Sequence, residues 1–178
     1  MILNVASGGR RWCAETDAEI SAVVAEVISS LRGWDRESEW VSPGTNAWFS
    51  WSDHRIVDPA DMPTNTLIVS LNKETGYGGL IWFVTAEYPG AEEDEVLANI
   101  WVSDNPHPPS GETEVVAEPG EPYFFESRSV LLIDEVKAAL DEFCRVRTGM
   151  RPECVQWTPG EVSGRRADRE EEEVLHDF

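Results

Sequence analysis

The stretch from Thr66 to Tyr88 restricts the fold more than any other part of this 178-residue sequence. It contains two apolar runs, Leu67 to Leu71 and Leu80 to Tyr88, whose β-branched and aromatic residues are typical of strands. Asn72 to Gly79 lies between them, and its glycines supply the positive φ angles that tight turns require. The pattern predicts a β-hairpin.

Two other segments show apolar residues at the three-to-four spacing of an amphipathic helix. The first has Thr16 or Asp17 as its N-cap and Gly33 as its stop signal. The second has Asp134 as its predicted N-cap and ends at a Thr-Gly pair, residues 148–149. We expect these two segments to be the main helices.

Further short strands are predicted at residues 47–52, 97–103, 113–117 and 153–157. Strands that cluster along the chain and are joined by short turns favour an α+β fold, here an antiparallel β-sheet with two main helices packed on one side. A chain of this length buries roughly two-thirds of its unfolded surface around one core. We therefore expect a single domain over residues 1–159 and a charged, flexible tail over residues 160–178.

The charge balance is strongly negative, because 34 Asp and Glu residues against 14 Lys and Arg residues give a net charge of -20. Such a field repels nucleic-acid phosphates and anionic membranes and favours encounter with a basic partner. Solubility or salt tolerance is an equally open reason for it. No apolar run reaches the roughly 18 residues of a membrane span, and the N-terminus does not resemble a secretion signal. We therefore expect a cytoplasmic protein that contacts neither membranes nor nucleic acids.

Residue types that carry catalysis or bind metals form no recognisable constellation in the sequence. The three histidines and three cysteines are scattered and lack the spacing of ligands. Cys144 and Cys154 fall beside apolar residues and are predicted to pack in the core, which leaves Cys13 as the most exposed thiol. The glycine-rich run at 76–79 joins two strands and does not open a helix, unlike a phosphate-binding loop. The sequence therefore predicts a protein without metal, cofactor or enzymatic activity.

The acidic residues are concentrated in one part of the sequence. From Glu87 to Ser127 there are eleven Asp and Glu residues and no Lys or Arg. Because they fall in predicted turns and loops, many of them must face solvent, where like charges repel one another. Two interpretations stay open: a solvated face without a binding role, or a surface matched to a basic partner, where charges raise the association rate.

Eight tryptophans are a second unusual feature of the chain. Five lie on predicted strands and are expected in the core or on the covered face of the sheet: Trp48, Trp51, Trp82, Trp101 and Trp157. The other three, at positions 12, 34 and 40, flank the first helix. An exposed one among them would suit an interface, where Trp is enriched.

Several motifs follow one another in the second half of the chain. They are Gly79-Leu80-Ile81-Trp82, Asn99-Ile100-Trp101, an acidic Pro-rich loop, and the run EVKAALDEFCRVRTGMRPECVQW. The most specific part is the helix with Ala139 and Phe143, followed by Thr148-Gly149, Arg151-Pro152, Val155 and Trp157. In this order the motifs resemble immunity protein family one of the bacterial polymorphic toxin systems, which is common in actinobacteria. The resemblance covers about residues 40–157.

This resemblance implies a non-enzymatic protein that binds and neutralises a cognate toxin domain, often a nucleic-acid deaminase or nuclease, in the cytoplasm of the producing cell. Such a toxin needs a positive groove for phosphates, which an acidic protein can occupy instead. We expect toxin Lys or Arg residues to contact Glu92, Glu93, Asp94, Glu95, Asp104 and Glu112. Apolar anchors are expected among Trp48, Trp51 and Tyr77.

Two alternatives stay open at this point. One is an adaptor or regulatory subunit whose partner is not a toxin. The other is a small hydrolase, which would hold one of a pair of carboxylates, with a raised pKa, in a deep pocket.

Overall fold

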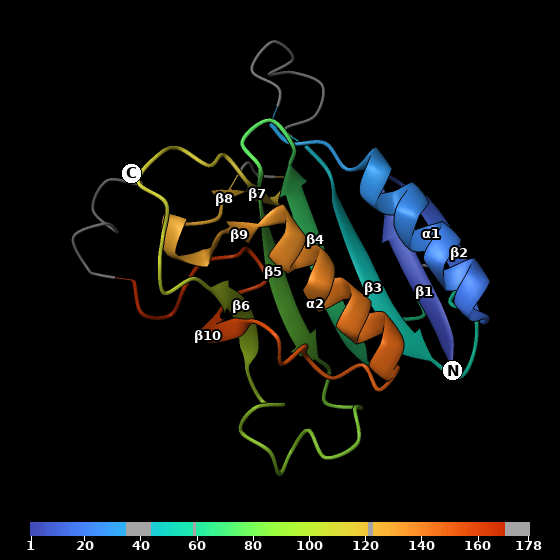
Figure 1. Cartoon of the computed structure of the whole chain (residues 1–178). Helices are drawn as coiled ribbons and strands as arrows, with labels where there is room; N and C mark the ends of the chain where they lie inside the picture. The colour runs from blue at the N-terminus through green and yellow to red at the C-terminus, as the bar shows by residue number, and fades with distance from the viewer. Residues whose placement is uncertain (35–43, 59, 121–122, 170–178) are drawn as a thin grey trace.

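The computed structural model of the chain describes residues 1–34, 44–58, 60–120 and 123–169 (Figure 1). The helices in these ranges are α1 (Asp17–Ser30), α2 (Ile133–Val146) and a short 3-10 turn, η2 (Ser127–Ser129). The strands are β1 (Ile2–Ser7), β2 (Arg10–Ala14), β3 (Asn46–Ser52), β4 (Asn65–Asn72), β5 (Tyr77–Val84), β6 (Ile100–Asp104), β7 (Val116–Glu118), β8 (Tyr123–Phe124), β9 (Leu131–Leu132) and β10 (Gln156–Gly160). None of the helices in the described ranges has the length and hydropathy that crossing a membrane requires.

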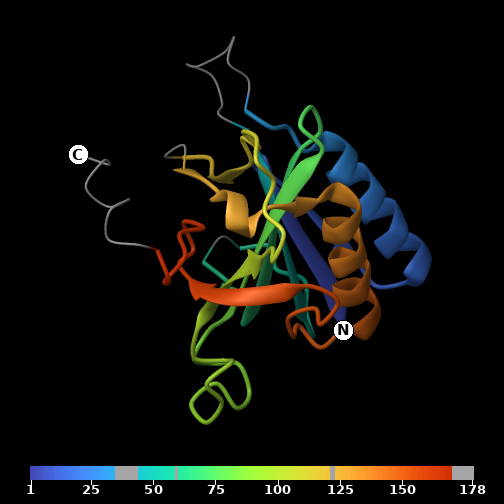
Figure 2. The ribbon, with the colours of Figure 1, turned by 60° about the vertical axis from the view of Figure 1, so that its left-hand side comes forward.

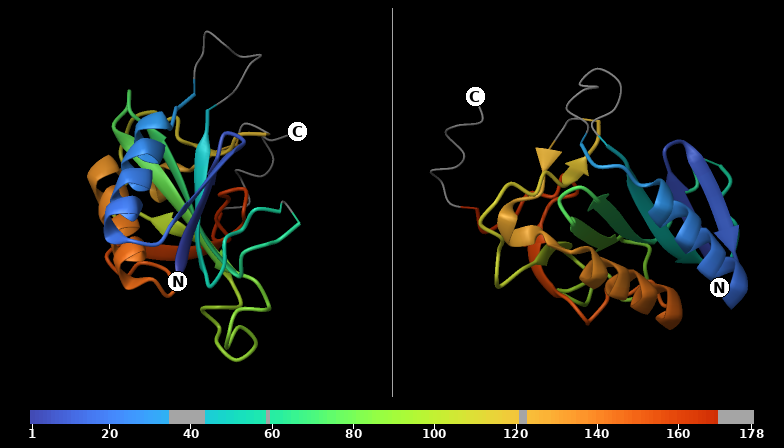
Figure 3. Two further views of the ribbon diagram at one scale, coloured as in Figure 1. Left: turned by 90° about the vertical axis from the view of Figure 1, so that its right-hand side faces the viewer. Right: turned by 45° about the horizontal axis from the view of Figure 1, so that its top comes forward.

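One large antiparallel sheet organises the molecule. Its strands follow the order β10-β6-β5-β4-β3-β1-β2, with β9 pairing β5 beside this path, while β7 and β8 form a separate two-stranded sheet. The predicted hairpin is β4–β5, in which Asn72 lies opposite Tyr77 at the turn. Both helices lie on the same face of the sheet, as the left view of Figure 3 shows. The predicted α+β fold is therefore confirmed.

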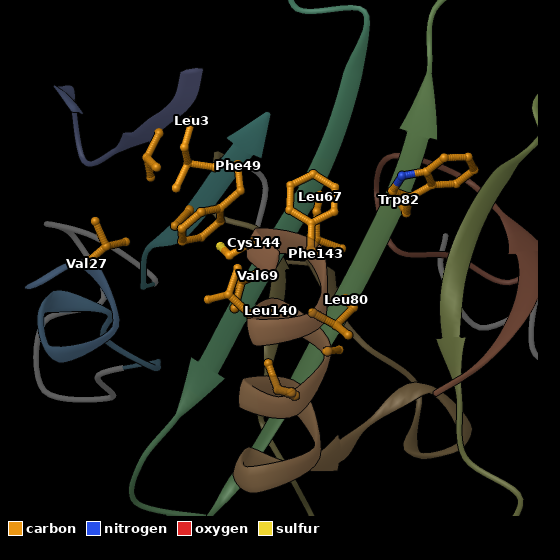
Figure 4. Close-up of a cluster of buried hydrophobic side chains, with 14 of the residues drawn as sticks. Leu3, Val27, Phe49, Leu67, Val69, Leu80, Trp82, Leu140, Phe143 and Cys144 are labelled. Carbon is orange, nitrogen blue, oxygen red and sulfur yellow. The ribbon is translucent and has the colours of Figure 1, made fainter. Parts of the chain in front are cut away.

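The main core lies between this face and the helices, where α1 lies over the β1–β2 hairpin and α2 over β4 and β5 (Figure 1). Leu140 and Phe143 of α2 face apolar side chains of the sheet, among them Phe49, Leu67 and Val69 (Figure 4). All five are at most 2% exposed. Burying a side chain of this kind contributes about 1.5–3 kcal/mol relative to leaving it in water, so this layer holds the helices in place.

The helix starts agree with the sequence at α1 and differ at α2. Thr16 caps α1, and its Oγ1 accepts the Glu19 N–H while the Glu19 carboxylate accepts the Thr16 N–H. The prediction of Asp134 as the N-cap of α2 is wrong, because the N-cap is Leu132. There the Glu135 carboxylate accepts the Leu132 N–H at 2.9 Å and orders the first turn directly after β9.

The last strand begins three residues later than predicted. The Glu142 carboxylate on α2 accepts the N–H groups of Glu153 and Cys154 at 2.9 and 3.0 Å, which holds these two residues in a turn. As a result β10 occupies residues 156–160 instead of 153–157. Cys154 is exposed, so its predicted place in the core is wrong, whereas Cys144 is buried as predicted.

The residues after β10 belong to the fold, which corrects the predicted tail. The side chain of Arg166 is only 4% exposed, and its guanidinium donates to Asp104 at 2.7 Å and to Asp168 at 2.8 Å. We call Arg166, Asp104 and Asp168 the C-terminal clasp. Residues 160–169 therefore pack on the domain, while residues 170–178 lie outside the described ranges.

Candidate partner-binding surface

The loop between β5 and β6, residues 85–99, is called the acidic loop here because it carries four consecutive acids of the predicted site. Glu92, Glu93, Asp94 and Glu95 are all exposed, and the loop projects beyond the end of the sheet (Figures 1 and 2). The carboxylates of Glu92, Glu93 and Glu95 form no hydrogen bond or ion pair with any described residue. Their charge is therefore directed at solvent.

Internal contacts order the acidic loop. Ala91 and Leu97 are 8% and 7% exposed and anchor the loop in the main core. Asp94 accepts the Val96 N–H on its side chain at 2.8 Å, and its carbonyl accepts the Leu97 N–H at 3.0 Å. The hydroxyl of Tyr88 donates to the Thr148 carbonyl at 2.9 Å and ties the loop to the chain beyond α2. The exposed acids are thus displayed from a structured loop.

The chain beyond α2, residues 147–155, is called the post-helix segment here. Three indole N–H groups donate to carbonyls in or next to it: Trp51 to Phe143 at 3.0 Å, Trp82 to Gly149 at 2.9 Å and Trp157 to Pro152 at 2.7 Å. Gly149 adopts a φ of +78°, and a Cβ there would lie 2.4 Å from Cγ of Asn65. The Thr-Gly, Arg-Pro and Trp motifs therefore fix the position of this segment beside the acidic loop.

The six predicted acids do not form one cluster. Glu112 precedes Thr113, whose carbonyl accepts a hydrogen bond at 2.8 Å from Thr75 in the β4–β5 turn. This turn lies at the opposite end of β5 from the acidic loop, roughly 23 Å away along eight residues of strand. Asp104 lies in the C-terminal clasp. Only Glu92 to Glu95 are close neighbours.

The three predicted anchors also lie apart from one another. Trp51 is 1% exposed inside the main core, so its predicted role as a surface anchor is wrong. Trp48 is half-buried on the face of the sheet away from the helices, where its ring packs edge-on against Phe83 at 6.3 Å. Tyr77 is half-buried and packs on the same small cluster, and Trp40 lies outside the described residues.

Several hollows open on the described surface, among them the following three. The first, of about 890 Å³, lies between α1 and α2, and its lining includes Lys137, Arg145 and Arg147. The second, of about 140 Å³, lies beside Trp48 on the opposite face of the sheet. The third, of about 720 Å³, lies between the acidic loop and the post-helix segment, with Met150 in its lining. We call the third hollow the Met150 groove.

The ionisable groups give the hydrolase alternative no support. In the part of the chain that the structure describes, the carboxyl groups with a shifted pKa all have a lowered one: Glu19, Asp53, Glu142 and Asp168. Burial raises the pKa of Cys144 to about 12, and partial burial of the sulfur together with the Glu142 carboxylate raises that of Cys154 to about 11, so both thiols stay protonated at neutral pH and are weak nucleophiles. Within the same residues no group of His, Cys, Asp and Glu side chains is placed to hold a metal ion.

An antiparallel sheet, two helices on one face and an acidic loop at one end define an acidic α+β protein. The family model described as Immunity protein Imm1 matches residues 8–159. The chain therefore belongs to the Imm1 family of immunity proteins, and the resemblance found in its sequence is confirmed. Membership implies a cognate toxin as the partner, and the family is generally non-enzymatic.

Two further comparisons found no similar protein. A search among curated proteins and a search among solved structures each gave no match.

Proposed function

We propose that this immunity protein binds a cognate toxin domain that acts on nucleic acids, a deaminase or a nuclease, and neutralises it in the cytoplasm by occluding its basic substrate site. The observation that carries the proposal is the acidic loop, in which three of four consecutive exposed acids have no partner among the residues that the structure describes. Carboxylates without an internal counter-charge are available to Lys and Arg side chains of another protein.

The physical basis is competition for the same positive surface. An enzyme that acts on DNA or RNA must attract phosphates with Lys and Arg residues. A protein of net charge -20 is drawn to the same residues, and the attraction falls steeply as salt is added. Inhibition then requires only that this protein stays bound to the toxin, and it involves no chemical reaction.

The test uses a catalytically inactive form of the cognate toxin domain. The triple substitution Glu92→Gln, Glu93→Gln and Glu95→Gln removes three charges and leaves Asp94, which orders the loop. We expect the association rate with the toxin to fall roughly tenfold or more at low salt, and to converge with that of the unsubstituted protein at high salt. Stopped-flow or surface-binding kinetics at several salt concentrations measure both rates.

A matched control removes the same number of charges at the other end of the sheet. Glu74, Glu112 and Asp134 are exposed and lie near the β4–β5 turn, where the Ile133 N–H donates to the Gly76 carbonyl. Their replacement by Gln, Gln and Asn tests whether net charge alone sets the rate. If the association rate fell equally in the two triple variants, the acidic loop would have no special role in binding.

Competition with nucleic acid tests occlusion directly. A labelled DNA or RNA oligonucleotide bound to the inactive toxin should be displaced when this protein is added. A stable complex that contains the toxin, the oligonucleotide and this protein together would show that the substrate site stays open, and that neutralisation works in another way.

A further inference from the structure

The Met150 groove lies directly beside the acidic loop, and both of its walls are held in place. On one wall, the Trp101 indole donates to the Val96 carbonyl at 2.7 Å. On the other, the Trp157 indole donates to the Pro152 carbonyl at 2.7 Å. A groove that is already formed in the free protein binds a partner without first ordering its own walls, which favours affinity.

The groove combines apolar and acidic lining. Its apolar side chains are Val96, Val146, Met150, Val155 and Trp157, and its acids are Asp94 and Glu153. Met150 is 36% exposed and Val146 is 47% exposed, so two aliphatic side chains face one hollow. Methionine adapts its shape to irregular partners and is common at binding surfaces.

Arg151 is the one cation that lines this groove, and every residue of the lining is among those that the structure describes. Its guanidinium lies over the Trp101 ring at 4.1 Å from the ring centre, and burial lowers its pKa. Asp94 and Glu153 are close enough to act against that lowering of the Arg151 pKa. The Nη1 atom of Arg151 is buried and has no acceptor among the described residues, so a shift of this side chain on binding would let it donate to a carbonyl oxygen of the partner.

We propose that the Met150 groove receives a segment of the toxin in which one aliphatic or aromatic side chain is flanked by Lys or Arg. The apolar side chain packs on Met150 and Val146, the flanking cations pair with Asp94 and Glu153, and a main-chain carbonyl accepts from Arg151. This inference rests on the proposed function and adds to it the place and chemistry of the anchor.

The other two hollows described above fit this partner less well. The groove between α1 and α2 is lined by three cations, Lys137, Arg145 and Arg147, and by only two acids, so its net charge is positive and suits a basic segment less well. The cavity beside Trp48 opens on the face of the sheet away from the helices and is lined by none of the acids of the acidic loop. Charge complementarity and continuity with the acidic loop therefore both favour the Met150 groove.

The two parts of the surface are expected to affect different rate constants. Surface charges mainly set the association rate, whereas packed apolar contacts at the centre of an interface mainly set the dissociation rate. The double substitution Met150→Ala and Val146→Ala should therefore raise the dissociation rate of the inactive toxin at least about tenfold. The association rate and its salt dependence should stay unchanged.

Met62→Ala is the matched control, because Met62 is 65% exposed and lines the cavity beside Trp48. It should leave both rate constants unchanged. Thermal unfolding checks that each variant is folded, and amide hydrogen exchange on the unsubstituted protein should show protection of residues 96–101 and 150–157 when the toxin binds.

The outcomes separate the two proposals. If the toxin binds and the acidic-loop variant associates slowly, but the double variant dissociates at the normal rate, the Met150 groove is not the anchor and the proposed function stands. If Met62→Ala speeds dissociation instead, the anchor is one of the two hollows that Met62 lines, beside Trp48 or beside Tyr88, and this inference is overturned. If the unsubstituted protein binds no toxin, the proposed function itself fails.

Discussion

Carboxylates occupy two contrasting environments in this protein, the C-terminal clasp and the acidic loop. In the clasp, Asp104 and Asp168 both accept hydrogen bonds from Arg166, whose side chain is almost fully buried. In the acidic loop, Glu92 and Glu93 face solvent and pair with no cation in the described part of the chain. The first set stabilises the fold, whereas the second set contributes only repulsion to it.

The difference shows how acids with a folding role can be told from acids that are available to a partner. Position in the sequence does not separate them, because Asp104 of the clasp and Glu92 and Glu93 of the acidic loop all lie within the cation-free stretch from Glu87 to Ser127. Asp104 differs from the acids of the loop because it pairs with a cation, Arg166, which lies 62 residues further along the chain. The following predictions test this contrast.

The largest effect is expected for Arg166→Met. The substitution leaves Asp104 and Asp168 facing each other without their shared cation, and it should lower the free energy of unfolding by about 2–3 kcal/mol. This is less than for a fully buried pair, because Asp168 is about half exposed. Urea unfolding with an unchanged m value measures it. Arg128→Met is the control, since Arg128 is 40% exposed and its loss should cost less than about 1 kcal/mol.

A smaller effect is expected at acid pH. The hydrogen bond from Arg166 holds the pKa of Asp168 below its usual value, so this carboxylate contributes stability above the unfolded-state pKa of about 3.9. That contribution is lost as the pH falls through the lower folded-state pKa. It should amount to less than about 1 kcal/mol, because the carboxylate is half exposed and screened by solvent. Asp168→Asn should flatten the acid limb of stability against pH, and an unchanged limb would contradict the pairing.

The triple substitution in the acidic loop should barely change stability. Replacing Glu92, Glu93 and Glu95 by Gln removes like-charge repulsion, so the free energy of unfolding should stay the same or rise by up to about 0.5 kcal/mol. Thermal unfolding at low salt measures the difference. A clear loss of stability would mean that these carboxylates have a role in folding, as those of the clasp do.

The smallest effect concerns His54, which lies between two carboxylates on the surface. Its Nδ1 is 2.6 Å from Asp53 and its Nε2 is 3.0 Å from Asp61, and these contacts raise the pKa of the imidazole. Any stability from the pair is present below the unfolded-state pKa of about 6.5 and is lost as the pH rises through the higher folded-state pKa. Asp61→Asn should lower the His54 pKa in an NMR titration, while Asp58→Asn should leave it unchanged.

Local patterns in the sequence were enough to predict the two main helices and the β4–β5 hairpin, but not strands β2, β8 and β9. The β4–β5 hairpin follows from glycines between two apolar runs, and the start of α1 from a Thr three residues before a Glu. These signals are local because the residues that interact are close in sequence. Where a distant side chain intervened, the prediction was wrong: Glu142 displaces the start of β10, and Arg166 adds ten residues to the domain.

The candidate site was less accessible to sequence reasoning. The cation-free run shows where acids are concentrated in the sequence, but it does not show at which end of the sheet each acid lies. The sequence therefore predicts one binding site that contains both Glu112 and Glu92, although the whole length of β5 separates them. Trp51 was proposed as an anchor because a tryptophan on a strand can point to either face. The Met150 groove has no signal of its own, because its walls are brought together by indole hydrogen bonds between separate segments.

The strand order has a consequence for when a newly made molecule becomes active. Strands β1 to β5 come from the first 84 residues, but α2 and β10, which complete the main core and the Met150 groove, end at residues 146 and 160. At the usual pace of translation the chain needs roughly 4–15 s to extend from β5 to the end of β10. A nascent chain therefore lacks a complete core and a complete Met150 groove during this interval, and the toxin binding proposed above depends on the pool of finished molecules.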